Sequence, residues 1–169
     1  VELMRESDID CPTIAEWLCE NVQGTIGLNP EMYSVNAFAA LRSELGEAGL
    51  TTKSIDLIRP LWVDDRPAIP QNPLYEYEEK YAGESVQCKL TRIRQAMAKK
   101  KADAMIISAL DEIAWLLNIR GTDVEYNPVV ISYVVLEQNR CTLFVDAHKV
   151  NTQAADYLQR EHIDVQGYE

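Results

Sequence analysis

Histidine is scarce in this sequence, and the motifs of common catalytic centres are missing. The two histidines, His148 and His162, stand alone and belong to no metal-ligand pattern. HExxH, GxSxG, a Walker loop and GxGxxG are all absent, and no third glycine follows Gly24 and Gly27 to complete a nucleotide loop. The adjacent carboxylates Asp64–Asp65 point to different faces, so they predict no acid–base pair. We therefore expect no catalytic residue and no metal site on this chain.

Cysteine pairs with redox or metal-ligand spacing are also lacking. None of the four cysteines forms a CxxC pair, and each stands beside apolar residues: Cys11, Cys19, Cys88 and Cys141. Unpaired cysteine is commonly buried and reduced inside cells, and these spacings do not fit zinc. We expect four reduced, mostly buried thiols in a cytoplasmic protein.

Positive charge and long apolar runs are scarce as well. The chain has 16 Lys and Arg against 27 Asp and Glu, a net charge of -11. A nucleic-acid surface needs clustered basic residues, so we expect no nucleic-acid partner. The longest apolar runs have the length of a strand, well short of the ~20 residues that span a bilayer, and we expect no membrane partner. The acidic start lacks the apolar segment of a signal peptide and an initiator Met, which suggests a fragment or a processed product.

Apolar periodicity predicts alternating helices and strands in a single domain over residues 1–169. Adjacent strands joined by a short turn should pair antiparallel, so the fold class predicted is α/β, a mixed sheet flanked by helices. Helices are expected near 14–22, 30–46, 85–101, 109–119 and 151–160, and strands near 24–28, 51–57, 103–108, 128–136, 140–145 and 163–165.

Residues 59–80 contain four of the seven prolines. Proline removes backbone donors and restricts its neighbours, so this stretch predicts an extended, ordered loop that Trp62 pins to the body. The alternative is a partner-binding arm, since proline-rich segments also serve recognition. In the helix that follows, an apolar stripe should face the core, and the basic residues, Lys89 among them, should face solvent.

The loop from Arg120 to Pro128 is the most distinctive polar stretch. It combines one glycine, several hydrogen-bonding side chains and a proline that leads into an apolar strand. In one interpretation Arg120 pairs with Asp123 and fixes the loop. In the other, the loop tip faces a neighbouring domain or a ligand, because site residues often lie on loops held by a rigid scaffold. Before this loop, Ser108 and Asp111 have the spacing of a capping box.

The block from Ser108 to Val129, SALDEIAWLLNIRGTDVEYNPV, closely resembles the second domain of three-domain Xaa-Pro aminopeptidases (aminopeptidase P). Residues 58–67 resemble that family's I-W-T-D-R-P segment, with departures at Val63 and Asp64, and residues 82–92 resemble the start of its next helix. The resemblance implies a creatinase/prolidase N-terminal-domain-like fold in a larger hydrolase. Such enzymes remove an N-terminal residue that precedes proline.

The same resemblance implies that another domain of the parent enzyme holds the catalytic metal ions. A C-terminal pita-bread domain, absent from this chain, binds two divalent metal ions, usually manganese. This chain would then be a middle domain that is inactive alone and holds no cofactor. Its partners would be the first N-terminal domain, the catalytic domain and the peptide substrate. The parent enzyme would be a homodimer. Arg120, Asp123 and Asn127 become candidates for lining the substrate cleft or a domain interface. The alternative is a stand-alone module that binds a small ligand or peptide.

Overall fold

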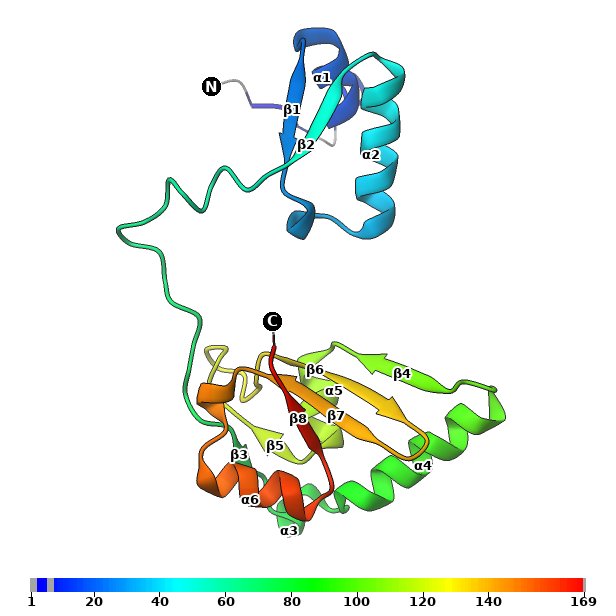
Figure 1. Cartoon of the computed structure of the whole chain (residues 1–169), viewed down its shortest axis with the longest axis vertical. Coiled ribbons are helices and arrows are strands. Elements are labelled where there is room, and N and C mark those ends of the chain that lie inside the picture. Colours follow the sequence, from blue (N-terminus) through cyan, green and yellow to red (C-terminus); the bar gives the residue numbers. More distant parts are fainter. Residues whose placement is uncertain (1–2, 6–7, 169) are drawn as a thin grey trace. The chain divides into compact units, whose positions relative to one another are not determined.

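The computed structural model describes residues 3–5 and 8–168. They form two compact units, residues 1–67 and 68–169, where the sequence analysis expected a single domain (Figure 1). Residues 55–74, which join the units, contain no helix or strand. Each unit has a hydrophobic core of its own, and each is described by itself.

The first unit is a small helix–strand–helix–strand arrangement. Its strands β1 and β2 are parallel, with Thr25 paired to Thr51. Leu28, Leu45 and Leu50 form its buried cluster, against which side chains of both helices pack. The expected helix from residue 30 is split, because Asn29 caps a single 3-10 turn and Ser34 caps the helix that follows. The elements are α1 (Ile14–Asn21), β1 (Thr25–Leu28), η1 (Pro30–Met32), α2 (Val35–Glu47) and β2 (Thr51–Ser54).

The proline-rich stretch contains no helix or strand up to residue 74, but it ends in the short strand β3 and the start of the helix α3, where a loop to residue 80 was expected. The expectation that Trp62 pins it to the body is wrong, because the residue is 46% exposed. Its indole N–H donates to Asp65 Oδ1 at 2.6 Å, a bond within the stretch itself. The hydrogen bond of the Trp62 side chain is therefore local, and its exposed ring adds little burial.

The second unit contains a mixed four-stranded sheet in the order β4-β6-β7-β8. The first two pairings are antiparallel, and β7 with β8 is parallel, which confirms the predicted fold class. Two short strands, β3 and β5, form a separate antiparallel pair that the sequence analysis missed. The elements are β3 (Tyr75–Glu76), α3 (Glu79–Ala82), α4 (Val86–Lys99), β4 (Ala104–Ile107), α5 (Leu110–Leu116), β5 (Ile119–Arg120), β6 (Ser132–Glu137), β7 (Cys141–Val145), η2 (Ala147–Lys149), α6 (Thr152–Arg160) and β8 (Asp164–Gln166).

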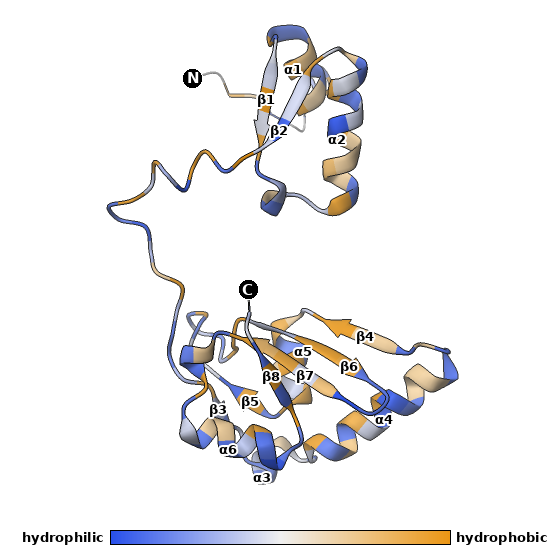
Figure 2. Cartoon of the chain, in the orientation of Figure 1, coloured by the Kyte–Doolittle hydropathy of each residue, from blue (hydrophilic) through white to orange (hydrophobic). Residues whose placement is uncertain are grey.

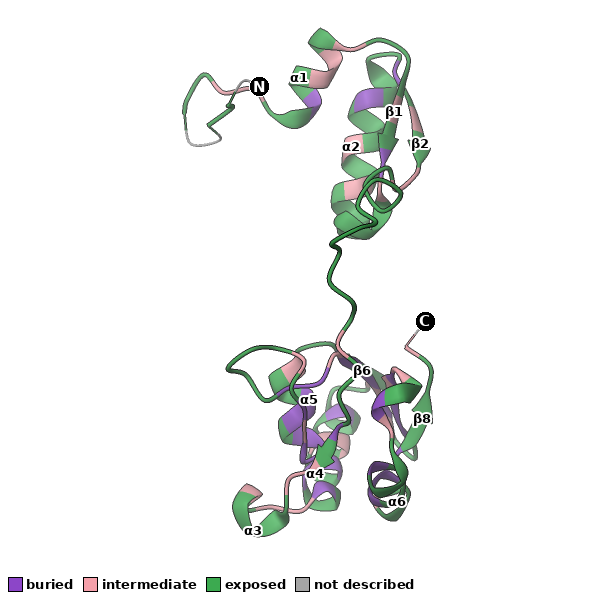
Figure 3. Cartoon of the chain, turned by 90° about the vertical axis from the view of Figure 1, so that its left-hand side faces the viewer, coloured by how far each residue is buried: buried purple, intermediate pink, exposed green. Residues whose placement is uncertain are grey.

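The core of this unit lies between one face of the sheet and the helices α4, α5 and α6. Strand residues of alternating position point into it, as the period of two requires. Figure 2 shows that β4, β6 and β7 are largely hydrophobic, and Figure 3 shows buried residues concentrated in this unit. The helices supply Leu90, Met97, Ile113, Leu116, Tyr157 and Leu158, and the strands supply Ile107, Val134, Leu136, Leu143 and Val145.

Three expectations about side chains are corrected. Lys89 is 1% exposed rather than solvated. Helix α5 begins after Ala109 and has no side-chain cap, so Ser108 and Asp111 form no capping box. The four thiols were expected to be mostly buried, but only Cys141 is buried, which raises the pKa of its thiol to about 11; Cys11 and Cys19 are half-buried and Cys88 is exposed. No helix in the described part of the chain is both long and apolar enough to cross a membrane.

Candidate functional site

The polar loop singled out by the sequence runs between β5 and β6. Its backbone is closed by four bonds: Gly121 N–H to Pro128 O, Asp123 N–H to Val129 O, Asn127 N–H to Val124 O and Val129 N–H to Asn127 O. Gly121 allows this closure, because a Cβ atom there would lie 2.6 Å from Val130 Cγ2. The base of the loop is therefore packed tightly against the chain that leads into β6.

Arg120 supports the base and does not pair with Asp123, contrary to the interpretation from sequence. Its guanidinium donates to Ala114 O at 2.7 Å and to Ile119 O at 2.8 Å. It also stacks over the ring of Tyr77, with 4.2 Å between the guanidinium carbon and the ring centroid. Its contacts thus connect the base of the loop to α5, β5 and the segment after β3.

Asp123 forms a buried ion pair with Lys149, and both side chains are 1% exposed. The same carboxylate oxygen, Oδ2, accepts a bond from the Ile131 backbone N–H at 2.6 Å. Lys149 O in turn accepts a bond from Leu74 N–H. One carboxylate thus connects the loop, the start of β6 and η2. Its other oxygen, Oδ1, is buried and has no hydrogen-bond partner among the described residues.

The tip of the loop is exposed. Asn127, the third candidate from sequence, lies at the surface and contributes backbone bonds to the turn. Tyr126 beside it is 96% exposed and has a left-handed backbone, with φ of 61°. Beside the tip is a hollow of about 550 Å³, lined by Tyr75 and residues 121–128. The structure therefore separates a buried base from an accessible tip.

A second polar network holds the turn that leads into the loop. Lys89 Nζ donates to Trp115 O and to Asn118 Oδ1, both at 2.7 Å, and lies 4.7 Å from the centroid of the Trp115 ring. Asn118 has a left-handed backbone, and its side-chain amide donates to Glu84 O. Burial lowers the pKa of Lys89, and the nearby Glu84 carboxylate opposes that shift. This network fixes where β5 begins.

Sequence reasoning missed the residues that decide the loop's geometry. Lys149 lies 26 positions after Asp123, and no local pattern links the two. Lys89 occupies a helix position next to the apolar Leu90, so a helical wheel with a wider apolar face would have indicated its burial.

The described residues bring no acid–base or metal constellation to this loop. Among them, no group of three His, Cys, Asp or Glu side chains lies close enough to hold a metal ion. His148 and Asp146 do interact in η2: hydrogen bonds from the His148 backbone and then from its ring lower the pKa of Asp146. Asp146 is the N-cap residue of η2, so its contact with His148 belongs to a helix cap at the protein surface.

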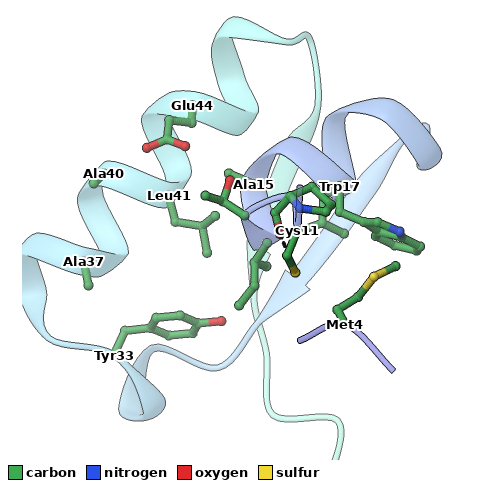
Figure 4. Close-up of a pocket in the computed structure, with 13 residues that line it drawn as sticks. Met4, Cys11, Ala15, Trp17, Tyr33, Ala37, Ala40, Leu41 and Glu44 are labelled. Atoms are coloured by element: carbon green, nitrogen blue, oxygen red, sulfur yellow. Dashed lines mark hydrogen bonds between the residues drawn. The ribbon is translucent and has the colours of Figure 1, made fainter. Parts of the chain in front are cut away.

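A larger hollow than the one beside the loop belongs to the first unit. It has a volume of about 920 Å³ and lies between α1 and α2 (Figure 4). Its lining is mainly apolar, with Trp17, Tyr33 and Leu41 facing it and Glu44 at its edge. A single carboxylate in apolar surroundings offers no pair for proton transfer, so this groove has the character of a packing surface.

A family profile and several known proteins match this chain. The sequence profile of the creatinase/prolidase N-terminal domain matches residues 65–169, nearly the same range as the second unit. The chain is 36% identical to a probable Xaa-Pro aminopeptidase P from Pyricularia oryzae, with 99% of this chain and 28% of the relative covered. It is also 36% identical to Xaa-Pro aminopeptidase 1 from Dictyostelium discoideum, with 93% and 27% covered.

A solved structure resembles the chain as well. It is the X-prolyl aminopeptidase from Caenorhabditis elegans, a cytosolic enzyme with a di-nuclear active site, at a TM-score of 0.82 and 28% identity. The match covers 99% of this chain and 28% of that one. The chain thus spans a little over a quarter of the length of the proteins it matches.

Proposed function

Because the chain belongs to the creatinase/prolidase N-terminal domain family, we propose that it is a noncatalytic N-terminal region of a metal-dependent Xaa-Pro aminopeptidase. The parent removes an N-terminal residue that precedes proline. One observation carries the proposal: nearly the whole chain corresponds to about a quarter of such enzymes in sequence and in structure. Its partners are the remaining domains of the same polypeptide, a peptide substrate and a second copy of the parent, in the cytoplasm.

In this proposal the metal chemistry lies outside the chain. The parent's two divalent ions, manganese in our proposal, would be held by carboxylate and imidazole side chains of its catalytic domain. Such ions polarise the scissile carbonyl and activate a water molecule. The described residues offer no matching ligand cluster, so we derive no step of the reaction through them.

The contribution of this chain is to shape the approach to the cleft. Arg120 and Asp123 hold the base of the loop, and Asn127 stands at its accessible tip. A loop with a buried base keeps its tip in one position without help from a ligand, which lowers the entropy lost on binding. In this proposal the tip of the loop faces the substrate cleft of the neighbouring catalytic domain.

The test compares the full-length parent with residues 1–169 alone. With added Mn²⁺, we expect the parent to release the first residue of an Xaa-Pro peptide and the isolated chain to release none. Product is measured by chromatography of the freed amino acid. Turnover by the purified isolated chain, or an inactive, correctly folded and metal-loaded parent, would refute the proposal.

A further inference from the structure

The first unit has a small core for an independent fold. Its buried cluster has three members among the described residues, Leu28, Leu45 and Leu50. Its sheet is a single pair of parallel strands in the part of the chain that the structure describes, whereas parallel strands usually belong to larger sheets that are covered on both faces. Units of this length are marginally stable even with a full core, because they bury a small share of their surface. The unit therefore needs apolar contacts beyond those that its described residues make with one another.

The groove between α1 and α2 is the place where such contacts can be added. It has a volume of about 920 Å³, and Trp17 faces it from α1 and Leu41 from α2 (Figure 4). Trp17 is 38% exposed, and Ile14 on the same helix is 62% exposed. Ala37 and Ala40 line the α2 side, and their short side chains leave room for an apposed segment. Exposed apolar surface that gathers in one place marks an interaction site.

The lining of this groove offers little that could orient a polar ligand. Among the described residues that line it, Glu44 is the only charged one. The Thr13 hydroxyl already accepts a hydrogen bond from the Glu16 backbone N–H, as the N-cap of α1. Binding sites for small molecules combine apolar walls with several placed polar groups. The chemistry of this groove therefore fits a permanent cover of apolar side chains better than an exchangeable ligand.

The longer polypeptide to which this chain corresponds is a source for that cover. The profile match over residues 65–169 leaves most of the first unit out, but the match to the Pyricularia oryzae relative covers 99% of this chain and only 28% of the relative. The Caenorhabditis elegans structure has the same two coverages, so residues 1–67 have counterparts in proteins with most of their length outside the match. A segment of the same polypeptide covers a groove at a high effective concentration, because no free partner has to be captured.

We propose that the groove between α1 and α2 binds an apolar segment of the parent polypeptide that lies outside residues 1–169. The inference rests on the proposed function, which supplies that parent. The segment packs its apolar side chains against Trp17, Ala37 and Ala40, and it enlarges the core that Leu45 and its neighbours begin. The first unit is then one part of a domain whose other part lies elsewhere in the parent.

Cys11 reports whether the groove is filled, because it lines the groove as a free, half-buried thiol. The full-length parent and residues 1–169 are each treated with N-ethylmaleimide under native conditions, and peptide mass spectrometry follows the modification of Cys11. We expect the rate to be about tenfold lower or less in the parent, because the reagent reaches a covered thiol only when the structure opens locally.

Two variants of α2 localise the contact. Ala40→Gln places a longer polar side chain in the groove, whereas Ala39→Gln places the same side chain at an exposed position of α2 that does not line it. In the parent, Ala40→Gln should displace the covering segment and raise the rate of Cys11 modification severalfold, and Ala39→Gln should leave that rate unchanged. In residues 1–169 alone neither variant should change it, because both positions are exposed there.

Equal rates of Cys11 modification in an active parent and in residues 1–169 would overturn the inference and leave the proposed function intact. Protection that grows with protein concentration would assign the groove to a second copy, and protection that requires an added Xaa-Pro peptide would assign it to the substrate. Either result would also overturn the inference. Hydrolysis of the Xaa-Pro peptide by the same parent is measured separately, and an inactive, correctly folded and metal-loaded parent would refute the proposed function.

Discussion

At the scale of the residue, the Asp123–Lys149 pair makes a sharp energetic prediction. Removing one partner of a buried pair leaves the other charge uncompensated, so we expect Asp123→Asn or Lys149→Met to lower the free energy of unfolding of the second unit by about 3–5 kcal/mol. Denaturant titration followed by the fluorescence of Trp115, which lies in that unit, measures it.

The double variant Asp123→Asn, Lys149→Met is the control for this pair. It removes both charges and keeps an acceptor for the Ile131 N–H, so it should be far closer to the wild type than either single variant. If the two single effects simply add in the double variant, the charges do not interact and the proposed support of the loop is wrong.

The predicted and observed contacts of the loop residues differ in an instructive way. That residues 120–127 form a polar loop before an apolar strand was predictable from their composition. Which of them support the loop and which face outward was not, because Arg120 and Asp123 find their partners in α5, β5 and η2. The expected pair of Arg120 with Asp123 does not form, because Arg120 donates to the carbonyls of Ala114 and Ile119 while Asp123 pairs with the distant, buried Lys149.

At the scale of the element, the close approach of Gly121 to Val129 and Val130, just before β6, predicts a steric effect. In Gly121→Ala the new methyl group would lie 2.6 Å from Val130 Cγ2 and 3.1 Å from Val129 O. Relieving such an overlap displaces the loop or the strand, and overpacking of this size lowers stability by about 1–3 kcal/mol. Chemical denaturation of the second unit gives the value.

The companion variant is Val130→Ala, which removes the methyl group that Gly121→Ala would meet. On that background, the added cost of Gly121→Ala should shrink clearly, leaving only the contact with Val129 O. If Gly121→Ala lowers stability by the same amount on both backgrounds, the contact with Val129 O dominates and the Val130 side chain does not lie against Gly121 as described.

Helices and long strands were predictable because their signals are periodic and repeated. Apolar residues at helical spacing predicted α4 and α6, and continuous apolar runs predicted β6 and β7. The two-residue strands β3 and β5 were missed, since two residues carry no period and their pairing joins Tyr75 to Arg120, 45 positions apart. The strand expected at 128–136 begins only at Ser132, because the residues before it complete the loop.

At the scale of the whole molecule, the two units differ greatly in the cores that support them. The buried cluster of the first unit has three members among the described residues, and that of the second has nineteen. A pair of parallel strands is rarely stable alone, because parallel sheets are usually covered on both faces. The first unit also leaves Ile14, Met32 and Val35 exposed. Most of the stability of this chain therefore resides in residues 68–169.

That imbalance predicts two separate unfolding transitions, and the tryptophans are placed to report them. Trp17 lies in the first unit, Trp115 in the second, and Trp62 in the segment between. With Trp62→Phe as background, one variant adds Trp17→Phe and the other adds Trp115→Phe. Fluorescence of the remaining Trp17 should report a transition at lower urea than fluorescence of the remaining Trp115, because less apolar surface is buried around it. Circular dichroism of both variants checks that neither substitution moves the transitions. Coincident midpoints for the two reporters would mean that the units unfold as one cooperative body, and that the small core of the first is stabilised by the second.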